Sequence, residues 1–514
     1  MTFIEYLRFG LYYLGLLLLL VLLYEAFRAW VVGWFLKRLR RRISRYVRAR
    51  SVRVDKYKLT SKLYVKAEVL SDPILARHIA DYAQQEKIPA EEVREEVEAW
   101  LDEIIPAFNV VSYYQVAVFL ARTASKSLYD VVIDREQLQK IEGQIPEGSV
   151  AIYLSNHRSN ADYVLLTYAL MRSVAISYAV GEWARVFPLD VLFRSFGSYF
   201  VRRGFKNPLY HKVLERYVQL VSLRGVTQAI FPEGGLSRDG LLRQPKLGLL
   251  DYICRILLEP GFTGDVVFVP IGINFDRVLE DQNLLREAQN KAKPPSFFTK
   301  LIGFFVWMLK FPFLLLANLL RVLLGKRRRY GYAAVSAGTP ISLKEWIAKQ
   351  PNNPLELPRA EREVRLKELA AEIMKHIERA VPVTPVPLVA LALERCGEGC
   401  TMSQLKREVA FLRAEAQRMG LPLVEGSEFI AEQVSKRRLE EGREDRRPEL
   451  LALEESMVEG DSASLTTRLG LENLQRRNLI QVQNNKITID PTRKDIVAYY
   501  AHSLDHLRRA LQGQ

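Results

Sequence analysis

The sequence predicts an α/β catalytic domain, with a mixed or largely parallel sheet and flanking helices, between a helical N-terminal region and a helical C-terminal domain. Short apolar runs typical of buried strands recur between residues 150 and 336, and stretches with helical periodicity separate them. A long apolar segment opens the chain, and charged helical stretches dominate beyond Pro351. At 514 residues the chain is long enough for two to four domains.

Residues 1–50 are predicted to form a membrane helix followed by a basic segment. The run 9–24 is apolar for sixteen residues, which is about 24 Å as a helix and shorter than the roughly 30 Å hydrocarbon core. The apolar character continues to Leu36, so the whole segment 9–36 is long enough to span. Residues 37–50 read KRLRRRISRYVRAR, and the positive-inside rule then places the body of the protein on the cytoplasmic side of the cell (inner) membrane. A secretory signal peptide is not expected, because the segment has no small-residue cleavage site and its basic cluster follows the apolar run.

The formal net charge of +15 admits nucleic acid, an anionic membrane surface or anionic substrates as partners. The basic cluster 37–50 directly follows the apolar segment, so we expect it to contact anionic membrane lipids and not nucleic acid. The three cysteines, Cys254, Cys396 and Cys400, form no even disulfide framework, which indicates a reducing compartment. Cys396 and Cys400 have no nearby histidine or second pair, and no metal site is predicted.

Residues 51–130 are predicted to form a helical domain, and residues 131–350 the catalytic domain. The candidate strands of the catalytic domain lie at 150–155, 175–180, 197–201, 226–231, 266–273 and 331–336. Before the last strand, the insert 296–329 contains the apolar stretch 296–324, which is interrupted by Lys300, Lys310, Pro312 and Arg321. We expect it to lie in the cytoplasmic leaflet of the membrane; the alternative is a buried core helix.

Residues 351–514 are predicted to form a helical, winged-helix-like C-terminal domain. A charged helix over 359–380 precedes VPVTPVPL, a proline-rich break, and further helical stretches run to Met419. Residues 479–490 alternate in polarity on both sides of Asn484 and Asn485, which predicts a β-hairpin.

The stretch 151–163, AIYLSNHRSNADY, joins the first of these strands to a helix that we expect to begin near Ala161. Ser159 is the predicted N-cap, with Asp162 three residues later, as in a capping box. This placement leaves His157 in the loop before the helix. Asp162 then has two interpretations: a helix cap, or a carboxylate that holds the imidazole of His157 in one tautomer.

Three later stretches support the second interpretation: GSYFVRRGF at 197–205, FPEGGLSRDG at 231–240 and VVFVPIGINF at 266–275. Together with 151–163, and in this order, they resemble the four blocks of the glycerolipid acyltransferases with the HX4D motif, most closely those of the glycerol-3-phosphate acyltransferase family. The resemblance runs from about residue 60 to the end, where 496–507 also looks like that family. It implies a membrane-bound enzyme that moves a fatty acyl group from acyl-CoA or acyl carrier protein to the sn-1 hydroxyl of glycerol 3-phosphate, the first step of phospholipid synthesis, without a cofactor.

Acyl transfer from a thioester to a hydroxyl requires a base to remove the alcohol proton. By the resemblance, His157 is this base and Asp162 orients it. No serine or cysteine nucleophile is needed when the alcohol attacks directly, and Ser237 lacks the GxSxG context of a nucleophile elbow.

The acceptor phosphate requires cations, and guanidinium groups bind phosphate bidentately. Two adjacent arginines on a strand face opposite ways, so at most one of Arg202 and Arg203 is expected to enter the site. Glu233 is expected to bond acceptor hydroxyls or to hold an arginine. The resemblance implies a substrate-binding set of Arg158, Arg202, Arg203, Glu233, Gly234, Gly235, Ser237 and Arg238.

Two positions depart from the family pattern. Asn160 stands where a second histidine is common, and Leu236 stands where the family has an arginine near the phosphate. The base and its orienter are untouched, but the acceptor is left open: dihydroxyacetone phosphate or lysophosphatidate are alternatives to glycerol 3-phosphate. A non-catalytic membrane-tethered binding protein is a further alternative, which the retained FPEGGLSR stretch disfavours because a tether has no use for it.

Overall fold

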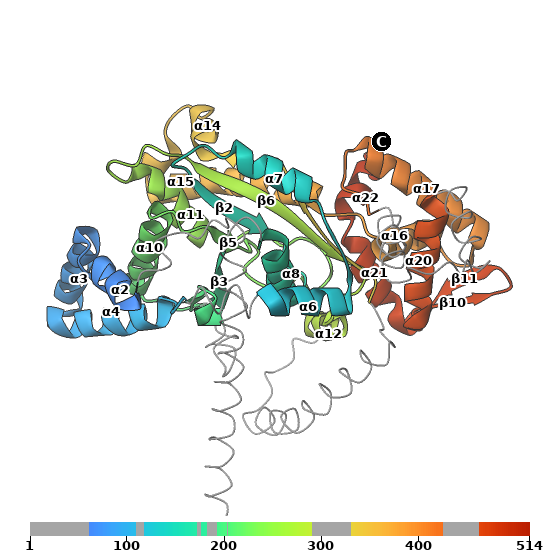
Figure 1. The fold of residues 1–514 in the computed structure, drawn as a ribbon, viewed down its shortest axis with the longest axis horizontal. Coiled ribbons are helices and arrows are strands. Elements are labelled where there is room, and N and C mark those ends of the chain that lie inside the picture. Colours follow the sequence, from blue (N-terminus) through green and yellow to red (C-terminus); the bar gives the residue numbers. More distant parts are fainter. Residues whose placement is uncertain are drawn as a thin grey trace, which may run out of the picture.

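The computed structural model describes residues 61–108, 118–171, 176–181, 193–202, 204–289, 330–424 and 462–513. The predicted membrane segment 9–36, the basic cluster 37–50 and the apolar stretch 296–324 lie outside these residues. None of the helices in the described ranges is long and apolar enough to span a bilayer. Figure 1 shows the described chain as three neighbouring parts, with N-terminal helices on one side, a twisted sheet with helices in the centre and C-terminal helices on the other side.

The central part is an eight-stranded mixed sheet, in the order β1-β7-β6-β2-β5-β3-β4, with β8 paired to β6. β2 is parallel to β5 and β6, and β3 is parallel to β4 and β5, whereas β7 and β8 run antiparallel to β6. The strands are β1 (Asp130–Ile133), β2 (Val150–Ser155), β3 (Ser177–Gly181), β4 (Tyr199–Val201), β5 (Gln228–Ile230), β6 (Val266–Phe275), β7 (Tyr332–Ala337) and β8 (Ile341–Ser342).

The predicted α/β architecture with a largely parallel sheet is confirmed, and each of the six predicted strands coincides with one of β2 to β7. β1 and β8 were not predicted. β6 is buried along its whole length, because β2 and β7 flank it and helices cover the sheet. Such two-sided burial explains why its sequence is a continuous apolar run without alternation.

Helices surround this sheet. The largest is α15, which packs against β6 and coincides with the predicted helix 359–380. The flanking helices are α6 (Val118–Leu128), α7 (Arg135–Gln144), α8 (Ala161–Leu170), α10 (Pro208–Leu223), α11 (Gly248–Cys254), α12 (Asp281–Gln289), α14 (Leu343–Ala348) and α15 (Arg359–Ala380).

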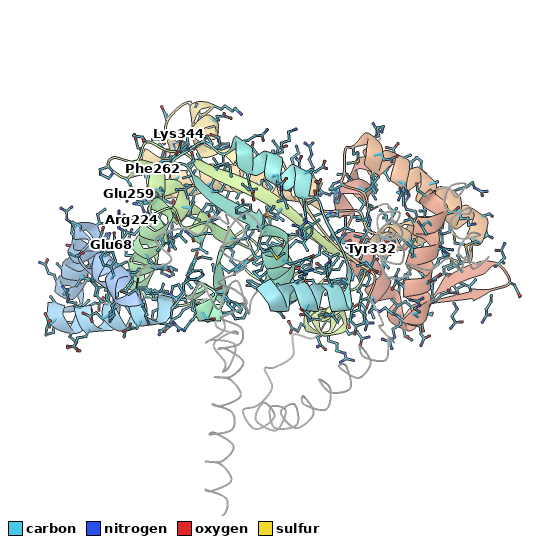
Figure 2. All side chains as sticks on the ribbon, viewed as in Figure 1. Glu68, Arg224, Glu259, Phe262, Tyr332 and Lys344 are labelled. Carbon is cyan, nitrogen blue, oxygen red and sulfur yellow. The ribbon has the colours of Figure 1, made fainter. Side chains whose placement is uncertain are left out.

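The N-terminal part is a helical unit of α2 (Lys62–Leu70), α3 (Pro73–Glu86) and α4 (Ala90–Ile104), which packs against α10. Asp72 caps α3 by accepting hydrogen bonds from the N–H groups of its first turn, and its carboxylate also pairs with Arg216 of α10 at 2.7 Å. Glu259 binds the same guanidinium, and Arg224 pairs with Glu68 of α2. Figure 2 labels Glu68, Arg224 and Glu259, which lie where the N-terminal helices meet the catalytic domain.

The C-terminal part contains a three-stranded sheet and five helices in its described ranges. The predicted hairpin forms between β10 and β11, with Asn484 and Asn485 at φ values of 49° and 61°. Two successive positive φ values fit the tight turn that asparagine favours. The elements of the C-terminal part are α16 (Pro385–Cys396), β9 (Cys400–Thr401), α17 (Met402–Arg418), α20 (Ser462–Arg476), β10 (Ile480–Gln483), β11 (Lys486–Ile489), α21 (Lys494–His502) and α22 (Asp505–Gln512).

The proline-rich stretch after α15 is not only a break. Pro385 occupies the first turn of α16, and Pro387 lies two residues later in the same turn. Proline is tolerated there, because the N–H groups of a first helical turn have no partner within the helix. Helix α16 therefore begins within the proline-rich stretch, and not after it as expected from the sequence.

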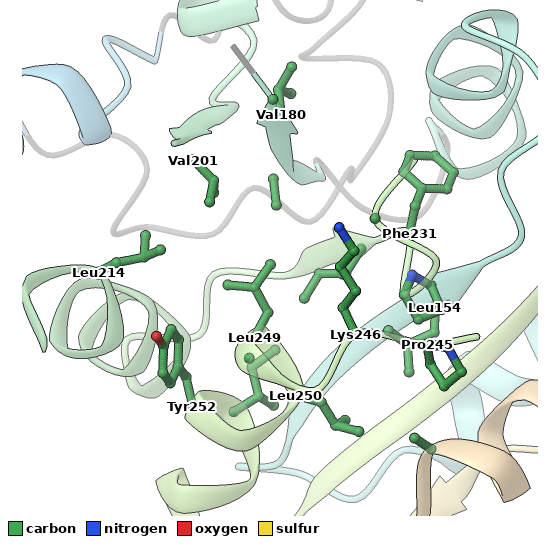
Figure 3. Close-up of a pocket in the computed structure, with 18 of the residues that line it drawn as sticks. Leu154, Val180, Val201, Leu214, Phe231, Pro245, Lys246, Leu249, Leu250 and Tyr252 are labelled. Carbon is green, nitrogen blue, oxygen red and sulfur yellow. The ribbon is translucent and has the colours of Figure 1, made fainter. Parts of the chain in front are cut away.

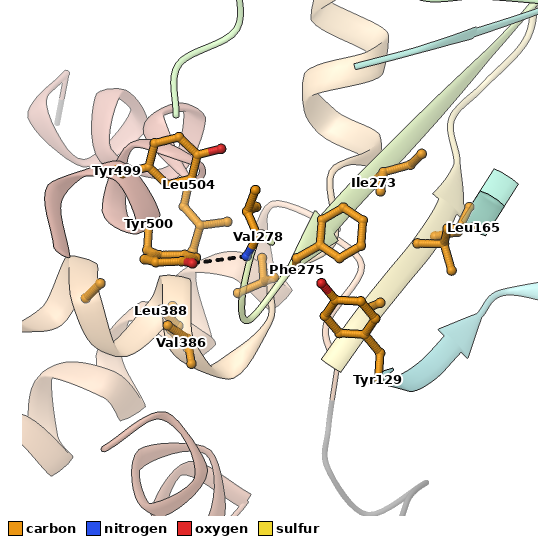
Figure 4. Close-up of a cluster of buried hydrophobic side chains, with 14 of the residues drawn as sticks. Tyr129, Leu165, Ile273, Phe275, Val278, Val386, Leu388, Tyr499, Tyr500 and Leu504 are labelled. Atoms are coloured by element: carbon orange, nitrogen blue, oxygen red, sulfur yellow. Dashed lines mark hydrogen bonds between the residues drawn. The ribbon is translucent and has the colours of Figure 1, made fainter. Parts of the chain in front are cut away.

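The C-terminal part docks on the sheet through a buried cluster, shown in Figure 4. The hydroxyl of Tyr500 accepts a hydrogen bond from the N–H of Val278 at 3.0 Å and donates one to Asp281 at 2.6 Å. Val278 and Phe275 belong to the same apolar cluster as Tyr499 and Tyr500. The residues that follow β6 are therefore fixed by helix α21.

Candidate active site

The predicted active-site loop connects β2 to α8 at the carboxyl edge of the parallel strands. Asn156 begins this loop, and its side chain is bonded twice to the main chain of Ile273 in β6, at 2.8 Å for each bond. In open α/β sheets, ligands bind at the carboxyl ends of the strands. The anchored amide therefore fixes the start of the loop at the edge where chemistry is expected.

His157 and Asp162 lie together in this loop. The Nδ1 atom of His157 is 2.9 Å from Oδ2 of Asp162, and both side chains are almost completely buried. The carboxylate thereby favours the tautomer that carries its proton on Nδ1. Nε2 is then the nitrogen left to accept a proton from a substrate.

Asp162 also shapes the loop. Its Oδ2 accepts hydrogen bonds from the main-chain N–H groups of Arg158 at 2.7 Å and Ser159 at 3.0 Å. The two predicted interpretations of Asp162 are thus not exclusive, since one oxygen contacts both the ring and the turn before the helix. The predicted N-cap is wrong by one residue: α8 begins at Ala161 with Asn160 as its N-cap, and Ser159 precedes it.

Two aromatic rings hold the plane of the His157 imidazole. Phe231 stacks on it with ring centroids 4.1 Å apart and an interplanar angle of 18°. Tyr163 meets it edge-on, with centroids 5.4 Å apart. Phe231 immediately follows β5 and Tyr163 lies in α8, so the ring is fixed by both the strand beside it and the helix after it.

Residues 231–240, the third of the four blocks and called the third motif below, bind the main chain of His157 on both sides of its Cα atom. Oε1 of Glu233 accepts the His157 N–H at 2.8 Å, and the carbonyl of His157 accepts the N–H of Ser237 at 2.8 Å. Oε2 of Glu233 accepts the N–H of Arg243, also at 2.8 Å. Both carboxylate oxygens of Glu233 thus bind main-chain N–H groups, and its expected contact with acceptor hydroxyls or an arginine stays a prediction. Burial raises the pKa of Glu233, and these two bonds oppose that rise.

The remaining residues of the third motif build its turn. Gly234 has φ of +64°, and a Cβ atom there would lie 2.7 Å from Cδ of Lys246. Gly235 follows in the same bend. The hydroxyl of Ser237 donates to the carbonyl of Leu241 at 2.8 Å and accepts the N–H of Gly240 at 3.1 Å, so it closes the loop and is not poised as a nucleophile.

Arg158 points toward the C-terminal part. Its guanidinium is buried and donates to the carbonyls of Gly240 at 2.8 Å and Ser503 at 3.2 Å. Burial lowers the pKa of this group, with nearby acidic groups opposing the shift. A Cβ atom on Gly240 would lie 2.0 Å from the carbonyl oxygen of Tyr499, so the third motif and helix α21 are in direct contact.

The predicted phosphate-binding arginines are not gathered at His157. Arg202 forms an ion pair with Glu103 of α4, with Nε 2.9 Å from Oε1, and lies over the ring of Phe205. Arg203 lies outside the described residues. Arg238 is half exposed and lies 3.3 Å from the carboxylate of Glu287.

Glu280 is a site residue that the sequence reasoning missed. Its Oε2 accepts a hydrogen bond from the hydroxyl of Ser159 at 2.7 Å, and its Oε1 accepts the N–H of Asn160 at 3.2 Å. It follows β6 and reaches the start of α8, and the apolar fourth block that precedes it gave the only signal of this location. Among the described residues, no group of histidine, cysteine and carboxylate side chains is arranged to hold a metal ion.

An apolar cavity of about 280 Å³ lies beside the catalytic loop, as shown in Figure 3. Phe231 and Tyr163, the two rings that contact His157, both line it. The rest of its wall is mostly aliphatic and comes from β2, β3, β4, β5, α10, α11 and α15, with Leu154, Val180, Val201, Leu214, Leu249 and Ile373 among the lining residues. The side chain of Lys246 also lines this cavity.

Known proteins resemble two regions of this chain. The acyltransferase family matches residues 131–274, and the glycerol-3-phosphate acyltransferase C-terminal region matches residues 316–450. The glycerol-3-phosphate acyltransferase of Pseudomonas fluorescens strain SBW25 is 31% identical over 332 residues, which cover 62% of this chain and 37% of that protein. The protein of the same name from Ectopseudomonas mendocina is 30% identical over 336 residues, covering 63% of this chain and 38% of that protein.

The chain thus spans a little over a third of the length of these relatives. Among solved structures, the 1-acyl-sn-glycerophosphate acyltransferase of Thermotoga maritima is 17% identical with a TM-score of 0.28, over 51% of this chain and 81% of that one. The two family matches fall on the domain that holds His157 and on the region that packs against it. Over these regions, the chain is similar to acyltransferases and to the glycerol-3-phosphate acyltransferases.

Proposed function

We propose that this protein is an acyltransferase that moves a fatty acyl group from a thioester, acyl-CoA or acyl carrier protein, to the sn-1 hydroxyl of glycerol 3-phosphate. The observation that carries the proposal is the pairing of His157 with Asp162 at 2.9 Å beside an apolar cavity. A buried histidine held in one tautomer is suited to be a general base. The names of the relatives support the reaction and the acceptor.

In the proposed reaction, Nε2 of His157 removes the proton from the acceptor hydroxyl as its oxygen attacks the thioester carbonyl. The carbon–sulfur bond then breaks, and the imidazolium returns the proton to the leaving thiolate. Asp162 stabilises the imidazolium and keeps the ring oriented, as the carboxylate does in a catalytic triad. Glu233 and Ser237 act as positioning residues, because Glu233 accepts the main-chain N–H of His157 and the N–H of Ser237 donates to its carbonyl.

The acyl chain has a suitable place in the cavity that Phe231 and Tyr163 line. Its wall is mostly apolar, so a fatty chain gains the free energy of leaving water, about 0.8 kcal/mol for each buried CH₂ group. The rings that contact His157 form part of this wall. A chain that fills the cavity therefore ends near the imidazole.

The phosphate of the acceptor needs cations other than the arginine that Leu236 replaces. Arg238 is the first candidate, because it lies in the same motif and its ion pair with Glu287 is half exposed and weak. Arg202 follows β4, which is the last strand in the sheet order. Its guanidinium is already paired with Glu103. The change at Leu236 also keeps dihydroxyacetone phosphate and lysophosphatidate as alternative acceptors.

We propose further that residues 9–36 and the basic cluster 37–50 attach the protein to the cytoplasmic face of the inner membrane, where anionic lipids contact the basic side chains. A fatty acyl product partitions into the bilayer, so membrane attachment places the enzyme where its product is used.

The test of the proposed function is an acceptor panel. Purified full-length protein receives labelled palmitoyl-CoA or palmitoyl carrier protein with glycerol 3-phosphate, dihydroxyacetone phosphate, lysophosphatidate or an uncharged alcohol. We expect a labelled 1-acylglycerol 3-phosphate with glycerol 3-phosphate, and much lower yields with the other acceptors. Acylation of the uncharged alcohol alone, or of no acceptor with either donor, would refute the proposal.

A further inference from the structure

A second cavity, of about 560 Å³, lies between the catalytic domain and the C-terminal helices. Its wall comes from α15, from the loop 241–245 that follows the third motif, and from residues 502–509 around the start of α22. Pro245 lines both this cavity and the apolar one. The two cavities therefore lie on either side of the same loop. A hydrogen bond from the N–H of Arg243 to Glu233 holds this loop.

One wall of this second cavity holds a buried positive charge. Arg158 is 2% exposed, and its described hydrogen-bond partners are two carbonyl oxygens, not a carboxylate. Its Nε has no hydrogen-bond partner among the described residues. An arginine keeps its charge in a protein, and a buried charge is costly unless an opposite charge lies nearby.

The acidic groups near Arg158, which include Glu233 and Asp162, lie outside this wall, and the wall itself carries more positive than negative charge. Both of its carboxylates, Glu378 and Asp505, are paired with Arg509. The Nη1 atom of Arg243 donates to a carbonyl at 3.3 Å, and the ammonium of Lys375 makes no hydrogen bond or ion pair within the described part of the chain. His506, 7% exposed, lines the same wall, and its Nε2 has no described partner either.

We propose that this cavity binds the phosphate groups of a nucleotide-sized ligand. Arg243 and Lys375 are the exposed cations of its wall that have no carboxylate partner among the described residues, whereas the exposed Arg509 is paired; Arg158 adds a buried charge. Guanidinium and ammonium groups are the usual protein partners of phosphate. The cavity has twice the volume of the apolar one. This volume suits a nucleoside diphosphate better than the smaller glycerol 3-phosphate.

Two sources supply such a ligand: the coenzyme A part of a donor, or a free nucleotide. Naming coenzyme A rests on the proposed function, whereas phosphate binding does not. The experiment measures the binding of coenzyme A, ADP and glycerol 3-phosphate to the full-length protein in detergent by calorimetry, without acyl transfer. The variant is Lys375→Glu. Its matched control is Lys367→Glu, on the same helix and exposed, but outside the cavity wall.

We expect Lys375→Glu to weaken nucleotide binding at least about tenfold, because a charge-assisted bond is replaced by a repulsion, and Lys367→Glu to leave the affinity unchanged. Loss of coenzyme A binding alone assigns the cavity to the donor, and equal loss for ADP shows that the diphosphate suffices. The proposal is overturned if neither nucleotide binds, if only glycerol 3-phosphate is affected, or if both variants behave alike. Because no turnover is measured, an inactive protein that binds coenzyme A in this cavity would refute the proposed reaction without refuting this site.

Discussion

Oδ2 of Asp162 lies 2.9 Å from Nδ1 of His157, and the same oxygen accepts the N–H groups of Arg158 and Ser159. One carboxylate oxygen therefore orients the base and closes the loop that carries it. Oδ1 of Asp162 has no hydrogen-bond partner in the described part of the chain. The two roles can be separated by substitution, because an amide keeps one oxygen and loses the charge.

Asp162→Asn is expected to lower kcat about 100-fold or more with a small loss of thermal stability, because the imidazolium loses its counter-charge while an oxygen can still accept the loop N–H groups. Asp162→Ala is expected to lower both kcat and Tm, because buried N–H groups then lack an acceptor, at about 1–3 kcal/mol each. Steady-state kinetics and thermal unfolding of both variants check this. An Asp162→Asn protein with wild-type kcat would reduce Asp162 to a structural residue.

Arg238→Ala is expected to raise the KM for glycerol 3-phosphate at least about tenfold, with little change in the KM for the acyl donor, because a charge-assisted bond contributes about 1.5–3 kcal/mol. Glu287→Gln serves as the control, since it removes the partner 3.3 Å from Arg238 and leaves the cation in place. Initial rates over a range of acceptor concentrations decide the matter. If Arg238→Ala and Glu287→Gln shift the acceptor KM equally, Arg238 does not hold the phosphate.

Asp276 is expected to give the protein a pH-dependent stability. This buried carboxylate accepts the N–H groups of Tyr332 in β7 and Val386 in α16, at 2.8 Å each, and so joins the sheet to the C-terminal part. Burial raises the pKa of Asp276 to about 7, and the two bonds oppose the rise. The folded state thus binds the proton more tightly than the unfolded chain, whose aspartate has a pKa of about 3.9.

The stabilisation by protonated Asp276 is therefore complete below pH about 4 and is lost as the pH rises through about 7. Between pH 5 and 8, the Tm of the wild type should fall relative to that of Asp276→Asn, which cannot ionise. Thermal unfolding of both proteins across this range measures the difference. Parallel Tm curves for the two proteins would show that Asp276 does not titrate there.

Gly240→Ala should uncouple the third motif from helix α21. Gly240 has φ of +86°, and a Cβ atom there would meet the Tyr499 carbonyl oxygen at 2.0 Å. Gly261 has φ of +81° but open space around its Cα, so Gly261→Ala carries only the backbone strain of about 1–2 kcal/mol. We expect a clearly larger loss of Tm for Gly240→Ala, together with a fall in activity. Equal losses in both variants would mean that the contact with α21 is not needed.

Much of the fold could be predicted from local sequence. The six longest runs of strand character became β2 to β7, and the asparagine pair produced the β10–β11 turn, because buried strands and tight turns leave short-range signals. β8 has only two residues, and the four residues of β1 are only partly buried, so neither strand has the apolar run that marks a buried strand. Proline occurs both in breaks between helices and in the first turn of a helix. The proline-rich pattern around Pro385 therefore could not show that α16 begins there.

The site was less predictable, because it depends on strand order and on long-range contacts. In the order β2-β5-β3-β4, the strand that precedes Arg202 lies three positions from the strand that precedes His157, roughly 14 Å at the usual strand spacing. No local pattern reveals that order. Glu280 and Ser503 reach the catalytic loop from 121 and 345 residues away, so the motif alone could not point to either residue.

His157 is proposed as the base for acyl transfer to glycerol 3-phosphate, and this role can be measured directly. Its most direct test is the rate at which the purified full-length protein and its His157→Ala variant form labelled 1-acylglycerol 3-phosphate from palmitoyl-CoA and from palmitoyl carrier protein, with Tm measured on the same samples. We expect the wild type to form the product with at least one of the two donors. The His157→Ala variant should form it about 100-fold or more slowly at a similar Tm. A folded His157→Ala protein that forms this product at the wild-type rate would contradict it.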